Sequence, residues 1–174
     1  MLSSNDGQLA RAARSGSARA ADELARRHAP TAWKVAYRLT GSRDLADEVS
    51  QEAFGRAFRG LGGFDVRRPF GPWLNAIIVN CARDALSRQR FTVDVDINLL
   101  PAPDAGRETA LDLSRALAAL SPERQTIVVS HLAGYSVKQI AESLDVPMGT
   151  AQSRLARALA ELRSTLQTED VDHV

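Results

Sequence analysis

The chain has little of what metal centres, disulfides and membrane spans require. Its 174 residues contain one cysteine, Cys81, so neither an internal disulfide nor a cysteine-rich zinc site can form. The three histidines, His28, His131 and His173, are scattered and form no His-x-x-x-His pair for a metal. No apolar run approaches the roughly 20 residues of a membrane span, and residues 1–17 have no apolar stretch of signal-peptide type. We therefore expect a cytoplasmic protein without metal or other cofactor, with Cys81 buried as a small apolar residue.

The sequence also lacks the patterns on which catalysis usually depends. No Gly-rich phosphate loop follows a strand, and no strand is strongly predicted. The adjacent acids Asp22-Glu23 and Asp47-Glu48 fall on charged faces of predicted helices. We therefore expect neither an enzymatic activity of its own nor a small-molecule substrate.

The composition favours helices, and the charge is distributed unevenly. Aromatic residues make up only 5% of the chain, and Ala, Leu and Arg are abundant. The net charge of +1 conceals a basic first half: residues 1–90 hold 15 Lys and Arg against 9 Asp and Glu. Residues 91–107 hold 1 basic residue against 3 acidic residues, and residues 108–174 hold 6 basic residues against 9 acidic residues. The asymmetry indicates different partners for different segments, although chance surface composition explains it equally well.

Three helices are predicted in the first half of the chain, and no element is assigned before Ser17. Ser17 is a suitable N-cap for a helix that ends at Gly41, and Pro30 is expected to kink or split that helix. Ser42 begins a second helix, and a third runs from Pro72 to residue 90.

The second half again shows helical periodicity, after a segment that breaks it. Residues 91–107 contain two prolines and no partner for a strand, so they are predicted to form an extended linker. Helices then start near Glu108 and after the Ser121-Pro122-Glu123 cap, and Ser136 with Gln139 forms a capping box for a further helix. The predicted fold is all-α: two small helical domains, 1–90 and 108–174, joined by a flexible linker, 91–107.

The last two predicted helices have the pattern of a helix-turn-helix. Asp145-Val146-Pro147 forms the turn, and the final helix has an apolar stripe that includes Ala151 and Leu155. The opposite side, near the helix N-terminus, is polar and basic, as a helix that enters the DNA major groove requires. The alternative is an ordinary surface helix of a bundle. The residues predicted to contact DNA are Gly149, Thr150, Gln152, Ser153, Arg154 and Arg157.

Three segments together resemble one family. LAGYSVKQIAESLDVPMGTAQSRLARALAELR is similar to the C-terminal DNA-binding region of bacterial sigma factors, most closely the small extracytoplasmic-function (ECF) group. ADEVSQEAFGRAFRG resembles that family's helix for binding core RNA polymerase, and PFGPWLNAIIVNCARDALSRQR resembles its helix for the −10 element. The resemblance implies a dissociable polymerase subunit. Residues 1–90 would bind core polymerase and open the −10 element, and residues 108–174 would recognise the −35 element as duplex.

The resemblance also implies two further sets of site residues. Phe54 and Phe58 extend the apolar arc of their helix beyond one buried stripe, which suits a partner surface, although a broad intramolecular core would account for them as well. Asn80 either binds an extruded base or plays a structural role, and Phe64 is able to stack on a base. The core-binding set is Asp47, Glu48, Gln51, Glu52, Phe54, Arg56, Phe58 and Arg59, and the −10 set is Phe64, Arg67, Arg68, Asn80, Arg83, Arg88 and Arg90.

Two other functions remain open at the level of sequence. A stand-alone helix-turn-helix regulator would bind an operator as a dimer, with residues 1–90 as a sensor or dimerisation module. A protein-interaction adaptor would need no DNA. In the sigma-factor interpretation, the partners are core RNA polymerase, promoter DNA and an anti-sigma protein, which regulates many members of the family.

Overall fold

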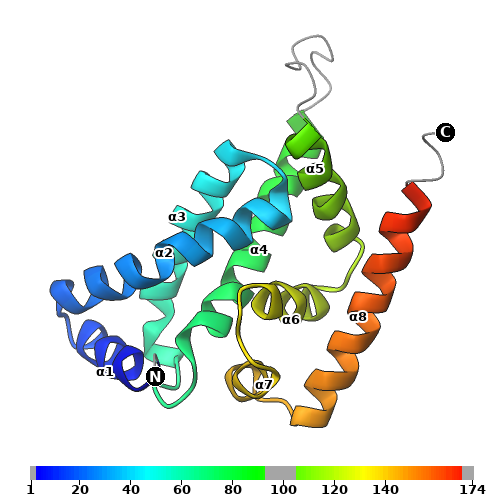
Figure 1. The fold of residues 1–174 in the computed structure, drawn as a ribbon. Helices are drawn as coiled ribbons and strands as arrows, with labels where there is room; N and C mark the ends of the chain where they lie inside the picture. The colour runs from blue at the N-terminus through cyan, green and yellow to red at the C-terminus, as the bar shows by residue number, and fades with distance from the viewer. Residues whose placement is uncertain (1–2, 93–104, 170–174) are drawn as a thin grey trace.

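The computed structural model describes residues 3–92 and 105–169, and every regular element in these two ranges is helical (Figure 1). Within the first range, α2, α3 and α4 are the long helices, and a 3-10 turn, η1, follows α3. Within the second range, short helices precede the long α8. The bounds are α1 Ser3–Arg14, α2 Ala18–Thr40, α3 Arg43–Gly60, η1 Leu61–Gly63, α4 Phe70–Thr92, α5 Ala105–Ala118, α6 Pro122–Leu132, α7 Val137–Leu144 and α8 Met148–Glu169.

Side-chain caps start the helices where the sequence predicts them. The hydroxyl oxygen of Ser17 accepts from the backbone N–H of residue 20, at 3.3 Å, and that of Ser42 accepts from residue 45, at 3.4 Å. Gly41 ends α2 in the left-handed conformation, with φ of 65°. Ser136 and Gln139 form the complete capping box of α7.

Several local features differ from the expectation. Pro30 does not split α2, which continues from residue 18 to residue 40. α4 starts at Phe70 rather than at Pro72, and it ends two residues inside the predicted linker. Ser121 stands at the N-cap of α6, but its side chain makes no capping hydrogen bond. α5 begins at Ala105 rather than near Glu108, so residues 105–107 of the predicted linker are also helical, and the remainder, residues 93–104, lies outside the described residues.

The sequence does not predict α1, which lacks a long apolar run but is fixed by close packing and a buried carboxylate. Gly7 lies against the backbone carbonyl of Val66, where a Cβ would not fit. Asp6, 5% exposed, accepts hydrogen bonds from His28 Nε2, at 2.8 Å, and from Arg27, at 3.3 Å. A buried carboxylate with these partners ties α1 to α2.

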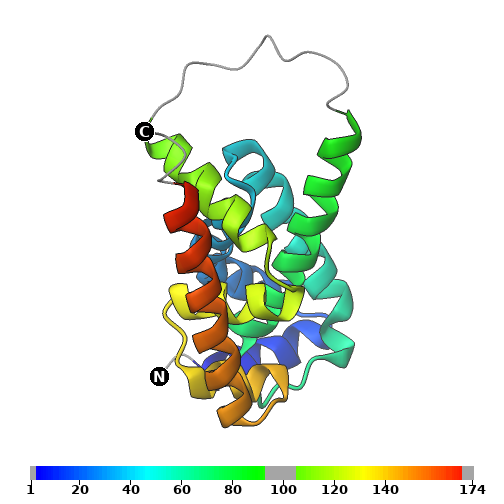
Figure 2. The ribbon, with the colours of Figure 1, turned by 90° about the vertical axis from the view of Figure 1, so that its right-hand side faces the viewer.

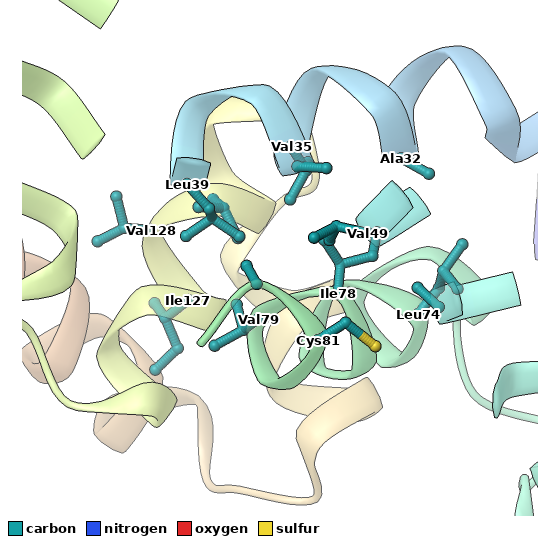
Figure 3. Close-up of a cluster of buried hydrophobic side chains, with 14 of the residues drawn as sticks. Ala32, Val35, Leu39, Val49, Leu74, Ile78, Val79, Cys81, Ile127 and Val128 are labelled. Atoms are coloured by element: carbon teal, nitrogen blue, oxygen red, sulfur yellow. The ribbon is translucent and has the colours of Figure 1, made fainter. Parts of the chain in front are cut away.

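Helices α2, α3 and α4 bury their apolar sides against one another. Val35 from α2, Val49 from α3 and Ile78 from α4 meet in the centre and are at most 1% exposed (Figure 3). Cys81 lies in the same cluster and is 2% exposed, as predicted, and burial raises the pKa of its thiol. In this three-helix layer, one side of α3 and one side of the C-terminal half of α4 are exposed to solvent.

The second helical module packs directly on the first. α6 lies against α4, α7 contacts the N-terminal half of α4, and α5 contacts the end of α2. α8 covers the far side of α6, so α6 lies between α4 and α8 (Figures 1 and 2). Ile127 and Val128 of α6 approach Leu39 and Val79 in the common core (Figure 3). The buried apolar residues of both modules therefore form one continuous cluster.

We predict that the capping box of α7 contributes measurably to stability. Ser136→Ala removes the acceptor for the Gln139 N–H, and the free energy of unfolding should fall by about 1 kcal/mol. Ser136→Asp keeps a side-chain acceptor at the N-cap, so the free energy of unfolding of this variant should fall much less. Urea denaturation of the three proteins measures the difference, and equal stability of the Ala and Asp variants would contradict the assignment.

Candidate nucleic-acid interface and partner surface

The turn between α7 and α8 has a fixed geometry. Asp145 has a left-handed backbone, with φ of 56°, and its N–H donates to the carbonyl of Ala141. The next residue, Val146, also donates to that carbonyl, at 3.1 Å. Ala141 and Ala151 are at most 4% exposed, so the two helices meet through small side chains. Together these contacts orient the start of α8 as a helix-turn-helix does.

The start of α8 presents an exposed polar and basic face. Gly149, Gln152, Ser153 and Arg157 are exposed, whereas Thr150 and Arg154 are half-buried. The first turn contains no acidic residue. Among the side chains described, those of residues 6–89 and 109–167, no ion pair involves Arg154 or Arg157. The structure thus brings the six predicted −35 residues together on one helix end whose dipole and free backbone N–H groups favour phosphate.

The predicted −10 residues lie on α4 and on the loop before it, and several already have partners. The Arg67 side chain, 85% exposed, donates two hydrogen bonds to Asp65, at 2.9 and 2.8 Å, and these hold the pKa of that carboxyl well below its usual range. Arg88 pairs with Glu48 at 3.0 Å. Asn80 is exposed on α4. The side chain of Arg90 lies outside the described residues.

Phe64 is covered in this arrangement. It is 3% exposed and packs in an aromatic cluster, with ring centroids 5.5 Å from Phe70 and 4.6 Å from Trp73. Its predicted stacking on a base therefore requires the loop around it to change conformation. That role stays a prediction.

The predicted polymerase-binding residues share one side of α3. Asp47 accepts from Trp33 Nε1 at 2.6 Å. Glu52 pairs with Arg56 at 2.8 Å, and the Arg56 hydrogen bond lowers the pKa of the Glu52 carboxyl. Arg56 also reaches Asp84 of α4, at 3.0 Å, whereas Gln51 and Arg59 are exposed.

Phe54 and Phe58 form the apolar part of that surface. Their rings stack with centroids 6.1 Å apart, and both side chains are half-buried. Each contacts the core with one edge and leaves the other accessible. The pair thus contributes to the core, and its role as a partner surface stays a prediction.

These surfaces carry no cluster of metal-binding side chains in the described part of the chain. No group of three or more His, Cys, Asp or Glu side chains is placed to hold a metal there. Among the same residues, no helix combines the length and apolar character needed to cross a bilayer.

Sequence reasoning missed the polar residues that join the two modules. Asn75 donates to the Ser130 hydroxyl at 3.0 Å, and the Ser143 hydroxyl donates to the Pro69 carbonyl at 2.9 Å. These partners are separated by 55 and 74 positions in the chain. Buried polar residues whose partners are so distant leave no local pattern in the sequence.

The geometry defines an all-helical protein with a helix-turn-helix and, on α3, a separate solvent-facing side that carries aromatic and charged residues. Two family models match it: Sigma-70 region 2 over residues 24–92 and Sigma-70, region 4 over residues 110–162. The chain belongs to the sigma-70 family of RNA polymerase sigma factors, in its ECF group.

Individual relatives agree with this assignment. The chain is 34% identical to the ECF RNA polymerase sigma factor SigE of Mycolicibacterium smegmatis over 83% of its own length and 61% of that protein's. It is also 34% identical to SigM of Mycobacterium tuberculosis, covering 93% of this chain and 85% of SigM. Among solved structures, CnrH in complex with the cytosolic domain of CnrY matches with a TM-score of 0.67 and 28% identity, over 94% of this chain and 98% of that one.

We predict that Arg154 and Arg157 contribute to binding of duplex DNA. Arg154→Ala or Arg157→Ala should weaken the affinity by about 1–3 kcal/mol if the lost contact is to a base edge. Arg163→Ala, an exposed arginine on the same helix but far from its N-terminus, is the matched control. Fluorescence anisotropy with a duplex that the wild-type protein enriches from a random pool measures all three. Unchanged affinity of both test variants would show that another face of α8 binds DNA.

Proposed function

We propose that this chain carries core RNA polymerase to promoters through surfaces on two modules. The helical module within residues 1–90 binds core polymerase by α3 and engages the −10 element by α4 and the preceding loop. The module within residues 108–174 recognises the −35 element as duplex by the start of α8. Residues 91–107 connect the two. The protein acts in the cytoplasm, where its polymerase is, and has no catalytic activity of its own.

One observation supports the proposal: an accessible aromatic and charged side of α3 and a basic start of α8 lie on the same chain, on different helices. The Phe54–Phe58 pair on α3 is accessible at its edges, and the start of α8 is free of acidic side chains. A stand-alone regulator needs the DNA-binding start of α8 and a dimer interface, but it does not need the polymerase-binding surface on α3. The family membership given above favours the same division of labour.

We also propose that an anti-sigma protein controls the chain. The relevant likeness is to CnrH, whose structure was solved with the cytosolic domain of CnrY bound. The match covers 94% of the present chain, and therefore both modules. A partner that spans both modules and covers the α3 surface and the start of α8 would keep them from polymerase and promoter.

Transcription in vitro tests the proposed function directly. The purified chain is mixed with core RNA polymerase of its host and fragmented host genomic DNA, and the 5′ ends of the transcripts are sequenced. Start sites should appear that core polymerase alone does not use, downstream of a shared pair of motifs. Binding to a palindromic operator without polymerase, with no core association in a pull-down, would instead identify the stand-alone regulator.

We predict that reversing the charge of Glu52 weakens the association with core polymerase. A lysine at this position would face Arg56 and Arg59, so both the charge pattern and the local ion pairs would change. Glu52→Lys should lower the affinity about tenfold or more in a competition assay for core polymerase, while circular dichroism remains that of the folded protein. Asp22→Lys, at an exposed position on α2, is the charge-matched control. Equal competition by the Glu52 variant would mean that the surface is misassigned.

A further inference from the structure

We propose that α1 positions the loop between η1 and α4, residues 64–69, for contact with the −10 element. The positioning residues are Asp6, Gly7 and, on α2, His28. The family model for region 2 begins only at residue 24, beyond the end of α1, so the matched region does not include this helix. What the 64–69 loop binds rests on the function proposed above.

The backbone of α1 lies directly against the backbone of the 64–69 loop. A Cβ added to Gly7 would overlap the carbonyl oxygen of Val66, although the helical backbone of Gly7 does not itself need a glycine. α1 also contacts η1, the turn that precedes the loop. A glycine inside a helix is less favourable than alanine by about 1 kcal/mol, and the close approach to Val66 accounts for it here.

Val66 stands between two residues that shape the exposed part of the loop. The Asp65 carboxylate accepts the backbone N–H of Arg67 at 3.0 Å, and it accepts two further hydrogen bonds from the Arg67 guanidinium. These bonds fix the guanidinium relative to the backbone of residues 65–67. Because α1 touches that backbone at Val66, the position of α1 also sets the position of Arg67, an exposed member of the predicted −10 set.

A second set of contacts joins α1 to the same loop through aromatic side chains. The buried Asp6 carboxylate accepts from His28 Nε2 at 2.8 Å. The His28 ring lies 5.0 Å from the ring of Phe70, the first residue of α4, and Phe70 meets Phe64 edge to face at 5.5 Å. Phe64 is the first residue of the loop, so the carboxylate of α1 and both ends of the loop belong to one packed cluster.

The contacts of Asp6 also anchor α1 on α2. A buried carboxylate that loses a hydrogen-bond partner is left unsatisfied, so displacement of α1 along α2 is unfavourable. Arg27 supplies a second contact to Asp6, at 3.3 Å, and is itself held by Glu23 at 2.7 Å. With α1 anchored in this way, a group inserted between Gly7 and the loop should displace the loop rather than the helix.

In this arrangement Phe64 serves as an anchor of the loop rather than as a side chain that stacks on a base. Its ring is buried and lies 4.6 Å from that of Trp73. The loop therefore presents Arg67 to solvent while Phe64 holds it from inside. The −10 strand meets the loop in this conformation, so displacement of the loop should weaken the contact.

The position of the loop is measured in the free chain by the fluorescence of Trp73, which packs on Phe64. Trp33→Phe leaves Trp73 as the only tryptophan. In this background, Gly7→Ala should increase the quenching of Trp73 by acrylamide, because the added methyl group displaces the loop. Gln8→Ala, at an exposed position of the same helix, is the matched control and should leave the quenching unchanged. Equal quenching in Gly7→Ala and Gln8→Ala overturns the proposal.

Two variants of His28 separate a positioning role from a role in folding alone. His28→Gln keeps an N–H donor for Asp6 and should give quenching close to that of the unmutated background. His28→Ala leaves the buried carboxylate with Arg27 alone and should increase the quenching. Equal behaviour of the two variants overturns the role of the hydrogen bond. Circular dichroism should show every variant folded, and unfolding of both Gly7→Ala and His28→Ala would make α1 a purely structural element and overturn the proposal.

The consequence for promoter binding is measured with holoenzyme at a promoter mapped by the transcription experiment above. The probe is a forked DNA whose non-template strand is single-stranded over the −10 element. Holoenzyme that carries Gly7→Ala should bind this DNA about tenfold more weakly, which corresponds to the loss of roughly one charged hydrogen bond. Competition for core polymerase should be unchanged, since α3 is not altered. Unchanged affinity for the forked DNA overturns the proposal.

A double-variant cycle shows whether α1 acts through Arg67. Arg67→Ala should itself weaken binding of the forked DNA, and Gly7→Ala combined with it should cause little further loss, because the affected contact is already absent. No loss from Arg67→Ala, or fully additive losses, would overturn the proposal. Absence of core association and of new start sites would contradict the proposed function instead, and it would leave the fluorescence result unaffected.

Discussion

The architecture depends on α4 being apolar on two faces. Leu74, Ile78 and Cys81 recur at helical spacing and face α2 and α3, while Asn75 and Val79 lie on the side toward α6 (Figure 3). A helix with two such faces cannot be covered by one three-helix layer alone. The second module supplies the missing cover, and for this reason a single core runs through the molecule.

Function is placed at the edges of this shared core. The polymerase-binding candidates on α3 and the DNA-binding candidates at the start of α8 both face solvent, although their helices bury their other sides. Two residues of the −10 set contact the second module, since Arg68 pairs with Asp145 and Arg83 donates to Gln125. The two outer surfaces thus remain open to partners in a chain whose inner surface is closed.

Local signals in the sequence predicted most of the helices well, because caps and apolar stripes act over three or four residues, whereas the functions of the candidate surfaces stay predictions. Ser17, Ser42 and the Ser136 capping box were confirmed on this basis. α1 was missed because it is held by Asp6 and by the approach of its backbone to Val66, neither of which produces a periodic pattern. The docking of the modules was missed for a related reason: its hydrogen bonds join residues more than fifty positions apart.

The chemistry of the module contact has a consequence for ionic strength. Its buried hydrogen bonds, from Asn75 and Ser143, involve neutral groups, which dissolved ions hardly screen, and only the partly exposed Arg68–Asp145 pair is sensitive to them. Binding to phosphates, in contrast, weakens steeply as the cation concentration rises. Concentrated electrolyte should therefore leave the contact of α4 with α6 and α7 intact while it weakens any attraction of the exposed arginines for phosphate.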